Sequence, residues 1–121
     1  MKILQISFVF CLLLTGSESF AQSAATKTSK IVTTEFSVQG VCGMCQARIE
    51  KAGLIKGVKL VSWDKDAQKV KVIYSAKKTK LEDIHRAIAG VGHDSDLVKA
   101  EEKDYKTLPD CCAYRDGVKV H

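Results

Sequence analysis

The spacing of apolar residues switches between two periods along residues 31–100. In three runs, apolar or β-branched residues alternate with polar ones, and in two others apolar residues recur at steps of three and four. Alternation is typical of a half-buried strand, whereas steps of three and four place residues on one face of a helix. The predicted strands are Ile31–Val38, Val58–Trp63 and Gln68–Ser75, and the predicted helices are Cys45–Gly57 and Leu81–Gly90.

The connections between these elements narrow the choice of fold. The polar turn Asp64–Ala67 predicts a hairpin, and Thr79 followed by Glu82 is a capping-box signature ahead of the second helix. A short run, Asp96–Ala100, is the predicted last strand. The order β-α-β-β-α-β predicts an α+β, ferredoxin-like sandwich, in which two helices cover one face of a four-stranded antiparallel sheet. Residues 31–100 are the predicted domain.

The amino terminus has the three parts of a secretory signal peptide. Lys2 supplies a positive charge, Ile3–Leu14 is nearly all apolar, and small residues stand three and one positions before a cleavage point ahead of residue 22. The apolar stretch is shorter than the roughly 20 residues that span a bilayer. We therefore predict that residues 1–21 are removed and that residues 22–30 form a flexible leader. The mature protein is expected in the periplasm or outside the cell, without stable membrane insertion.

Two cysteines, Cys42 and Cys45, stand between the first predicted strand and the first predicted helix. A thiolate binds metal, and the positive partial charge at a helix amino terminus lowers the pKa of a cysteine. Two intervening residues allow both sulfurs to face one point, and Gly43 lets the backbone turn without a side-chain clash. Two thiolates satisfy Cu(I) and Hg(II), whereas structural Zn(II) normally takes four ligands. The pattern predicts an exposed loop that carries a soft ion, Cu(I) first and Hg(II) or Zn(II) behind it.

The segment GVCGMCQARIEKA resembles the metal loop and first helix of the heavy-metal-associated domain. The resemblance extends from about Val32 to Val98, through VKVIY to the closing AIAGVGHD. The family usually has a Met and one further residue between the loop glycine and the first cysteine, whereas here Gly40 and Val41 lead directly into Cys42. Members include copper chaperones, amino-terminal modules of metal-pumping ATPases and periplasmic mercury-binding proteins. The resemblance implies the ferredoxin-like fold and a metal carrier or scavenger that is not an enzyme.

His93 and Met44 each have a functional and a structural interpretation, whereas His85 and His121 have only a structural one. His93 follows the second helix in a loop that, by resemblance, lies beside the metal loop. Similar bacterial copper chaperones carry a histidine there that reaches the ion, and an exposed loop imidazole is the alternative. His85 is predicted on the helix surface and His121 in the tail. Met44 is predicted to shield the site rather than to bind the ion.

Residues 101–121 fall outside the predicted fold and contain the adjacent pair Cys111 and Cys112. Neighbouring Cα atoms lie about 3.8 Å apart, below the usual range for bridged cysteines, so a disulfide between them would be strained. The extension is predicted to be a free tail or a loop packed on the domain. If it packs, its sulfurs complete a three- or four-coordinate site with the first pair, or hold a second ion. Ending the chain after Lys103 is predicted to leave the core whole.

The main alternative to metal carriage is a small thiol–disulfide oxidoreductase, which also places CxxC between a strand and a helix. Thioredoxin-like sites have a cis-proline beside the disulfide, by family resemblance. The only proline here is Pro109, beyond the last predicted strand. The β-β-α-β order after the first helix also differs from that class. A purely structural disulfide is the third interpretation.

The charge of the chain favours a protein partner over nucleic acid. The formal net charge is +5 at pH 7, but the lysines are scattered and few aromatic residues lie among them to stack on bases. We predict no nucleic-acid binding. A solvated basic surface is the simplest interpretation, and docking to an acidic-surfaced metal transporter or efflux component is the alternative. Lys51, Lys56 and Lys59 are the candidates for such docking.

Overall fold

The computed structural model describes residues 30–121, so the predicted signal peptide and nearly all of the leader lie outside the described residues. The strands are β1 Ile31–Ser37, β2 Val58–Asp64 and β3 Lys69–Ser75. The helices are α1 Gly43–Gly53, α2 Leu81–Ala89 and α3 Glu102–Tyr105, followed by the 3-10 helices η2 Asp110–Cys112 and η3 Tyr114–Asp116. Within this part of the chain, no helix combines the length and apolar character needed to cross a membrane.

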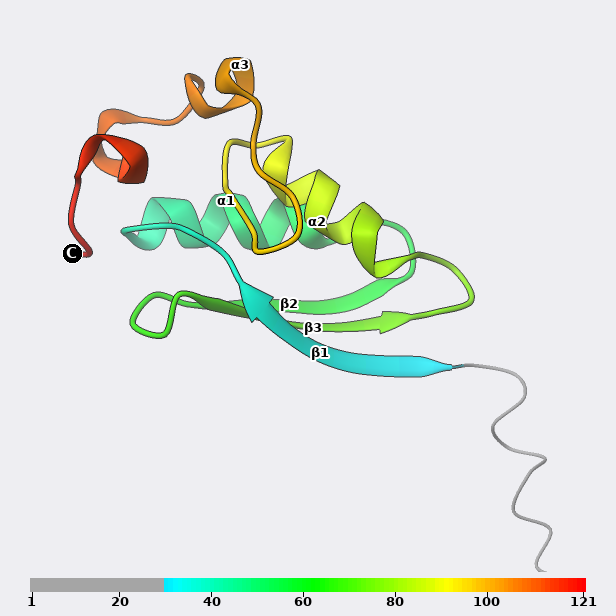
Figure 1. Ribbon diagram of the computed structural model, residues 1–121. Coiled ribbons are helices and arrows are strands. Elements are labelled where there is room, and N and C mark those ends of the chain that lie inside the picture. The colour runs from blue at the N-terminus through cyan, green and yellow to red at the C-terminus, as the bar shows by residue number, and fades with distance from the viewer. Residues whose placement is uncertain (1–29) are drawn as a thin grey trace, which may run out of the picture.

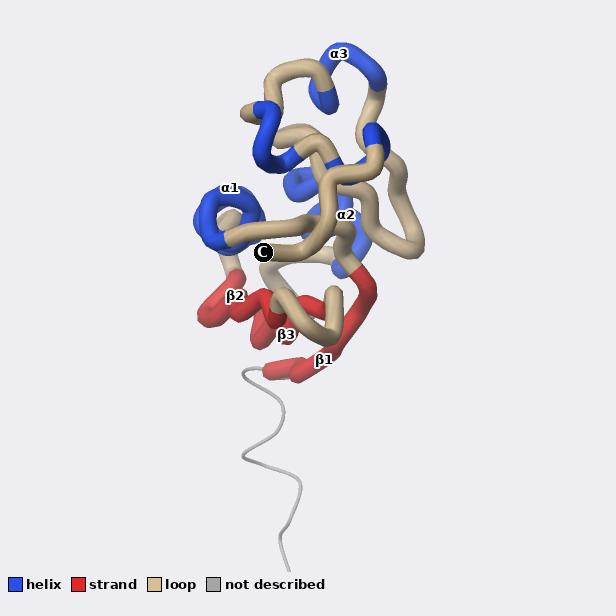
Figure 2. The backbone as a smooth tube through the Cα atoms, turned by 90° about the vertical axis from the view of Figure 1, so that its left-hand side faces the viewer, coloured by secondary structure: helices blue, strands red, loops and turns tan. Residues whose placement is uncertain are grey.

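The three strands form one antiparallel sheet in the order β1-β3-β2. Thr34 of β1 and Val61 of β2 both pair with Val72 of the central strand. Helices α1 and α2 lie on the same face of this sheet (Figure 1), and the end-on view shows them stacked above the strands (Figure 2). The predicted hairpin and the two-helix layer are therefore confirmed.

The core lies between the sheet and the two helices. Val70 and Val72 of β3 are fully buried, while Lys71 between them is exposed, as the alternating pattern predicts. Ile49 of α1 and Ile84 of α2 are also fully buried. Burying each such side chain contributes about 1.5–3 kcal/mol, so apolar contact between the layers stabilises the fold.

The predicted fourth strand at Asp96–Ala100 is wrong. Only one isolated antiparallel bridge forms in this region, between Val38 and Ser95. The Ser95 hydroxyl accepts a hydrogen bond from the N–H of Val98 at 3.1 Å, and the Asp94 carboxylate accepts one from the N–H of residue 100 at 2.7 Å. These short polar side chains take up backbone groups that a strand ladder would use. The segment therefore closes into a turn instead of extending along β1.

Both long helices differ from the prediction at their ends. Helix α1 begins at Gly43, two residues earlier than predicted, and ends at Gly53. Gly57 instead forms the turn into β2 with a φ of +92°, a conformation that glycine adopts without strain. The N-cap of α2 is Lys80, which makes no side-chain capping bond, so the predicted capping box is absent. The Thr79 hydroxyl lies 3.5 Å from the Lys80 carbonyl oxygen instead.

The carboxyl-terminal extension folds back on the domain (Figure 1). Tyr105, Leu108 and Cys112 lie in the same buried cluster as the residues of the sheet and helices. Of the two arrangements predicted for this segment, this structure shows the packed loop. The prediction that the chain can end after Lys103 without loss is wrong, because that truncation removes three core residues.

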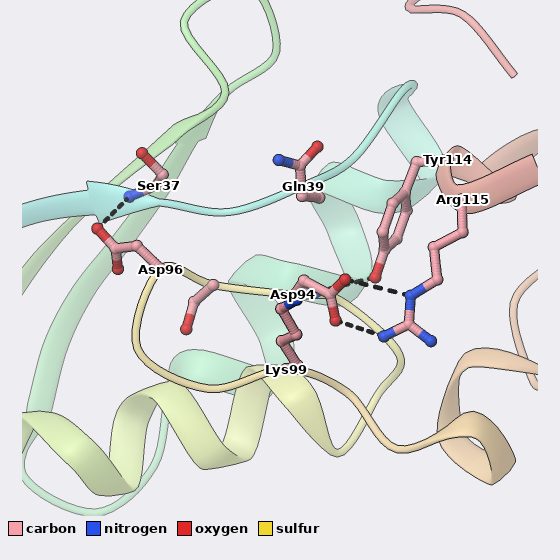
Figure 3. Close-up of a pocket in the computed structure, with 8 residues that line it drawn as sticks. Ser37, Gln39, Asp94, Asp96, Lys99, Tyr114 and Arg115 are labelled. Carbon is pink, nitrogen blue, oxygen red and sulfur yellow. Dashed lines mark hydrogen bonds and ion pairs between the residues drawn. The ribbon is translucent and has the colours of Figure 1, made fainter. Parts of the chain in front are cut away.

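Tyr114 and Arg115 fasten the extension to the loop that follows α2, and both side chains are directed at Asp94 (Figure 3). Arg115 binds the Asp94 carboxylate through two nitrogens, at 2.6 and 3.2 Å. The Tyr114 hydroxyl donates to the Gly92 carbonyl at 2.7 Å and accepts from the Asp94 N–H at 2.9 Å. Bidentate pairs between partly shielded charges are stronger than exposed ones. The extension is therefore held in a defined position.

Candidate metal centre

The backbone leading into α1 is held by Trp63. This indole is buried, and its N–H donates to the Val38 carbonyl at 3.0 Å. Gly40 passes so close to the ring that a Cβ atom at this position would lie 2.7 Å from Trp63 Cζ2. Only glycine fits there without displacing the indole. The chain therefore leaves β1 in a fixed direction and brings the next residues to the amino terminus of α1.

Cys42 and Cys45 meet at the start of this helix. Cys42 is the N-cap, with extended backbone angles, and Cys45 lies in the first helical turn. Their sulfurs are 3.6 Å apart. The prediction of an exposed loop is wrong, because Cys42 is 6 % exposed and Cys45 is fully buried. The carboxyl-terminal extension packs against this loop, since the backbone N–H of His121 donates to the Val41 carbonyl.

A third thiol, that of Cys112, joins this pair from the extension. Its sulfur lies 3.5 Å from that of Cys42, and the side chain is fully buried. The sulfurs of Cys42, Cys45 and Cys112 all lie within 4.8 Å of one another, and we call this group the three-thiol cluster. All four cysteines of the described residues are free thiols.

The spacing of the three-thiol cluster fits a single soft ion. Sulfur ligands surround Zn(II) at about 2.3 Å, and three sulfurs placed around an ion at that distance would be separated by about 4 Å. Two of the separations here, 3.5 and 3.6 Å, are slightly shorter than that value, and no pair of these sulfurs is more than 4.8 Å apart. Small side-chain rotations would therefore place all three sulfurs around one ion.

The thiols of Cys42 and Cys112 differ strongly in acidity. Burial raises the pKa of Cys42, but the backbone N–H of Cys45 and the neighbouring thiols outweigh burial and bring it down to about 7, from an ordinary 9.0. Burial raises the pKa of Cys112, and its two thiol neighbours raise it further. Of these two thiols, Cys42 thus ionises more readily.

His93 lies in the loop beside the cysteines, as the family resemblance implies, but outside the three-thiol cluster. Its Nδ1 is 2.7 Å from the Gln39 carbonyl oxygen, and its ring stacks near Tyr114 at a centroid distance of 5.8 Å. The side chain is fully buried, and its Nε2 has no hydrogen-bond partner. Burial lowers the pKa of His93, which favours the neutral ring. The alternative of an exposed imidazole is therefore wrong.

Cys111 points away from the three-thiol cluster although it neighbours Cys112 in the chain. Its thiol donates to the Met44 sulfur at 3.5 Å, and it is half-buried. Met44 is 53 % exposed. His121, the last residue, is exposed, but its backbone N–H donates to the Val41 carbonyl at 2.9 Å. The end of the extension thus also contacts the cysteine loop.

His85 is a core residue, which corrects the prediction that it lies on the helix surface. It is 2 % exposed, stacks on Phe36 at a centroid distance of 3.7 Å, and places Nδ1 at 2.5 Å from the Ser95 hydroxyl. Burial lowers its pKa. Sequence reasoning also missed Tyr114 and Arg115, which position the third thiol. Their only signal was their place close behind the cysteine pair, separated from it by one alanine.

The fold and the thiol cluster define a small α+β metal-binding domain. Residues 35–94 match the model of the heavy-metal-associated domain, and this part of the chain belongs to that family. Cys42, Cys45 and His93 lie within the match. Cys111 and Cys112 lie beyond it, so the third thiol comes from outside the matched domain. No curated protein sequence matches the chain.

Solved structures of three metal proteins are similar to this chain. The CopZ metallochaperone is 27% identical, with a TM-score of 0.51, over 53% of this chain and 98% of CopZ. Oxidized MerP from Ralstonia metallidurans CH34 is 26% identical, with a TM-score of 0.52, over 55% of this chain and 96% of MerP. The Cu(I)-loaded N-terminal domain of a potential copper-translocating P-type ATPase from Bacillus subtilis is 27% identical, with a TM-score of 0.52, over 60% of this chain and 94% of that domain. These likenesses support the ferredoxin-like fold, although the sheet here has three strands among the described residues.

Proposed function

We propose that this protein is an exported, non-enzymatic binding protein for a soft metal ion, acting as a metallochaperone or scavenger. The observation that carries the proposal is the convergence of three free thiols within 4.8 Å of one another. Membership of residues 35–94 in the heavy-metal-associated family supports it. Cu(I) is the first candidate ion, and Hg(II) or Zn(II) is the alternative. Export rests on the signal-peptide pattern of residues 1–21.

Cys42, Cys45 and Cys112 are the proposed ligands. Thiolates select soft ions such as Cu(I), whereas structural Zn(II) normally takes four ligands. The cluster offers three ligand atoms, and His93 and Cys111 lie outside it. Either would have to move before it could add a fourth. The donor set therefore favours Cu(I) or Hg(II) over Zn(II).

The cover over the sulfurs favours retention of the ion. A partner that removes the ion must bring its own ligand to it, and all three thiols are buried, one of them within the extension. The ion pair between Asp94 and Arg115 holds that cover in place. We therefore favour a scavenger, or a chaperone that releases its ion only when the extension moves. The exposed Lys51, Lys56 and Lys59 are the proposed docking surface for an acidic transporter or efflux component.

Acidification is expected to weaken Cu(I) binding, because the ion must displace protons from the thiols. Cys42 has a pKa of about 7, so it binds without releasing a proton above that pH and must release one below it. Cys112, whose pKa is raised, releases a proton throughout this range. The slope of log affinity against pH equals the number of protons that binding releases. This slope should therefore increase by about one as the pH falls from about 8 to about 6. Competition titrations against a Cu(I) chelator measure this slope, and an affinity that stays flat would contradict thiol coordination.

A dithiol oxidoreductase remains the second candidate function. It is favoured by one observation: Cys42 lies within 3.6 Å of Cys45 and within 3.5 Å of Cys112, so it has two neighbouring sulfurs with which to form a disulfide. The family of residues 35–94 favours metal binding instead. Catalytic turnover of a disulfide substrate without metal would favour this second function.

A further inference from the structure

The three-thiol cluster is almost completely shielded from solvent. Cys45 and Cys112 are fully buried and Cys42 is 6 % exposed. An ion that arrives from solution must therefore lose its first ligands before it reaches these sulfurs. An ion fills such a buried site faster if a soft ligand at the surface first binds the ion close to the site.

Met44 and Cys111 supply soft ligands at the surface beside the cluster. The Cys111 thiol lies 3.5 Å from the Met44 thioether sulfur, and Met44 is 53 % exposed. A thiol and a thioether are both ligands that Cu(I) prefers. Packing does not account for Met44, because more than half of this large apolar side chain faces solvent. The pair thus combines suitable chemistry with access from solution.

Chain connectivity places this pair next to the buried cluster on both sides. Met44 directly precedes Cys45 in the first turn of α1, and Cys111 directly precedes Cys112 in η2. Neighbouring Cα atoms are about 3.8 Å apart, so each outer ligand is one residue from an inner one. An ion held between the outer pair would pass to the inner sulfurs once the outer side chains rotate inward, because Cys111 points away from the cluster.

We propose that Met44 and Cys111 form an entry site, at which a soft ion binds before it passes to Cys42, Cys45 and Cys112. This inference rests on the proposed function. The transfer is a ligand exchange without electron transfer. The Cys111 thiol loses its proton to solvent when it binds the ion and regains one when the ion moves inward, while the inner thiols that bind as thiolates release theirs.

The rate of Cu(I) uptake tests the entry site. Cu(I) is supplied on a weak chelator, and uptake is followed by stopped flow for the native protein, M44L and C111S. Two tethered ligands hold an ion far longer than one, so each variant should take up Cu(I) more slowly by about tenfold or more. The equilibrium affinity for the first Cu(I) should not change, because the inner ligands are intact. Far-UV circular dichroism checks that both variants keep the fold.

A swap of side chains provides the matched control. Leu54, which follows the other end of α1, is also 53 % exposed, so M44L/L54M keeps one exposed methionine but moves its sulfur away from Cys111. This variant should be as slow as M44L. Unchanged uptake in M44L and C111S would overturn the entry site, as would a loss of equilibrium affinity as large as the loss of rate. A native protein that binds no Cu(I) would instead refute the proposed function itself.

Discussion

Replacement of Cys42 or Cys45 by serine is expected to lower the affinity for Cu(I) by more than about 100-fold, because residues that only support a metal ligand already contribute about 10- to 100-fold. Each substitution removes one sulfur from the three-thiol cluster. A hydroxyl is a poor ligand for a soft ion. The affinity is measured by titrating each variant against a Cu(I) chelator.

Both serine variants are expected to fold. Cys42 is the N-cap of α1, a position where serine is among the preferred residues. Cys45 is fully buried, but serine has nearly the same shape as cysteine and leaves no large cavity. C111S is the matched control, since its sulfur lies outside the cluster, and it should keep the native affinity. Undiminished affinity in both C42S and C45S would show that these cysteines are not ligands.

Replacement of Gly92 by alanine is expected to destabilise the protein and to displace the third thiol. Gly92 has a φ of +100°, and a Cβ atom there would lie 2.8 Å from the Asp104 carbonyl oxygen and 2.9 Å from Leu108 Cγ. The left-handed conformation alone costs about 1–2 kcal/mol for a residue with a Cβ atom. Because the clash adds to that cost, we expect a loss of at least about 2 kcal/mol in the free energy of unfolding, measured with urea.

The same variant tests whether the packing of the extension positions Cys112. The Gly92 carbonyl accepts a hydrogen bond from the Tyr114 hydroxyl. Movement of the backbone at Gly92 therefore loosens the segment that carries the third thiol. G43A is the matched control, because a Cβ atom at Gly43 meets nothing within 4 Å. In that helical position alanine should stabilise by at most about 1 kcal/mol. Equal unfolding free energies for G92A and G43A would mean that the extension does not depend on this contact.

The sheet and helices were predictable because their patterns are local. Alternation at Val70 and Val72 and the three- and four-residue steps in α1 and α2 follow directly from burial on one face. The last strand was not predictable, because the side chains of Asp94 and Ser95 bond the backbone of the next turn. The alternation of apolar and polar residues does not indicate whether such side chains will take the backbone hydrogen bonds of a strand.

The candidate site was only partly predictable. Cys42 and Cys45 share a short motif, so their proximity followed from the sequence. Cys112 is separated from Cys42 by 70 residues, and only the packing of a polar extension decides that it points inward while Cys111 points outward. The burial of His85 and His93 likewise depends on tertiary contacts with Phe36 and the extension.

Counting the sulfurs around the bound ion tests the three-thiol site directly. Removing the extension would delete core residues such as Tyr105 and Leu108, so C112S is the better variant. We expect X-ray absorption of the Cu(I)-loaded native protein to show three sulfur ligands, and that of C112S to show two. Two sulfurs in both proteins would contradict a role for Cys112 as a ligand, and would leave a two-cysteine site beneath a cover that does not bind the ion.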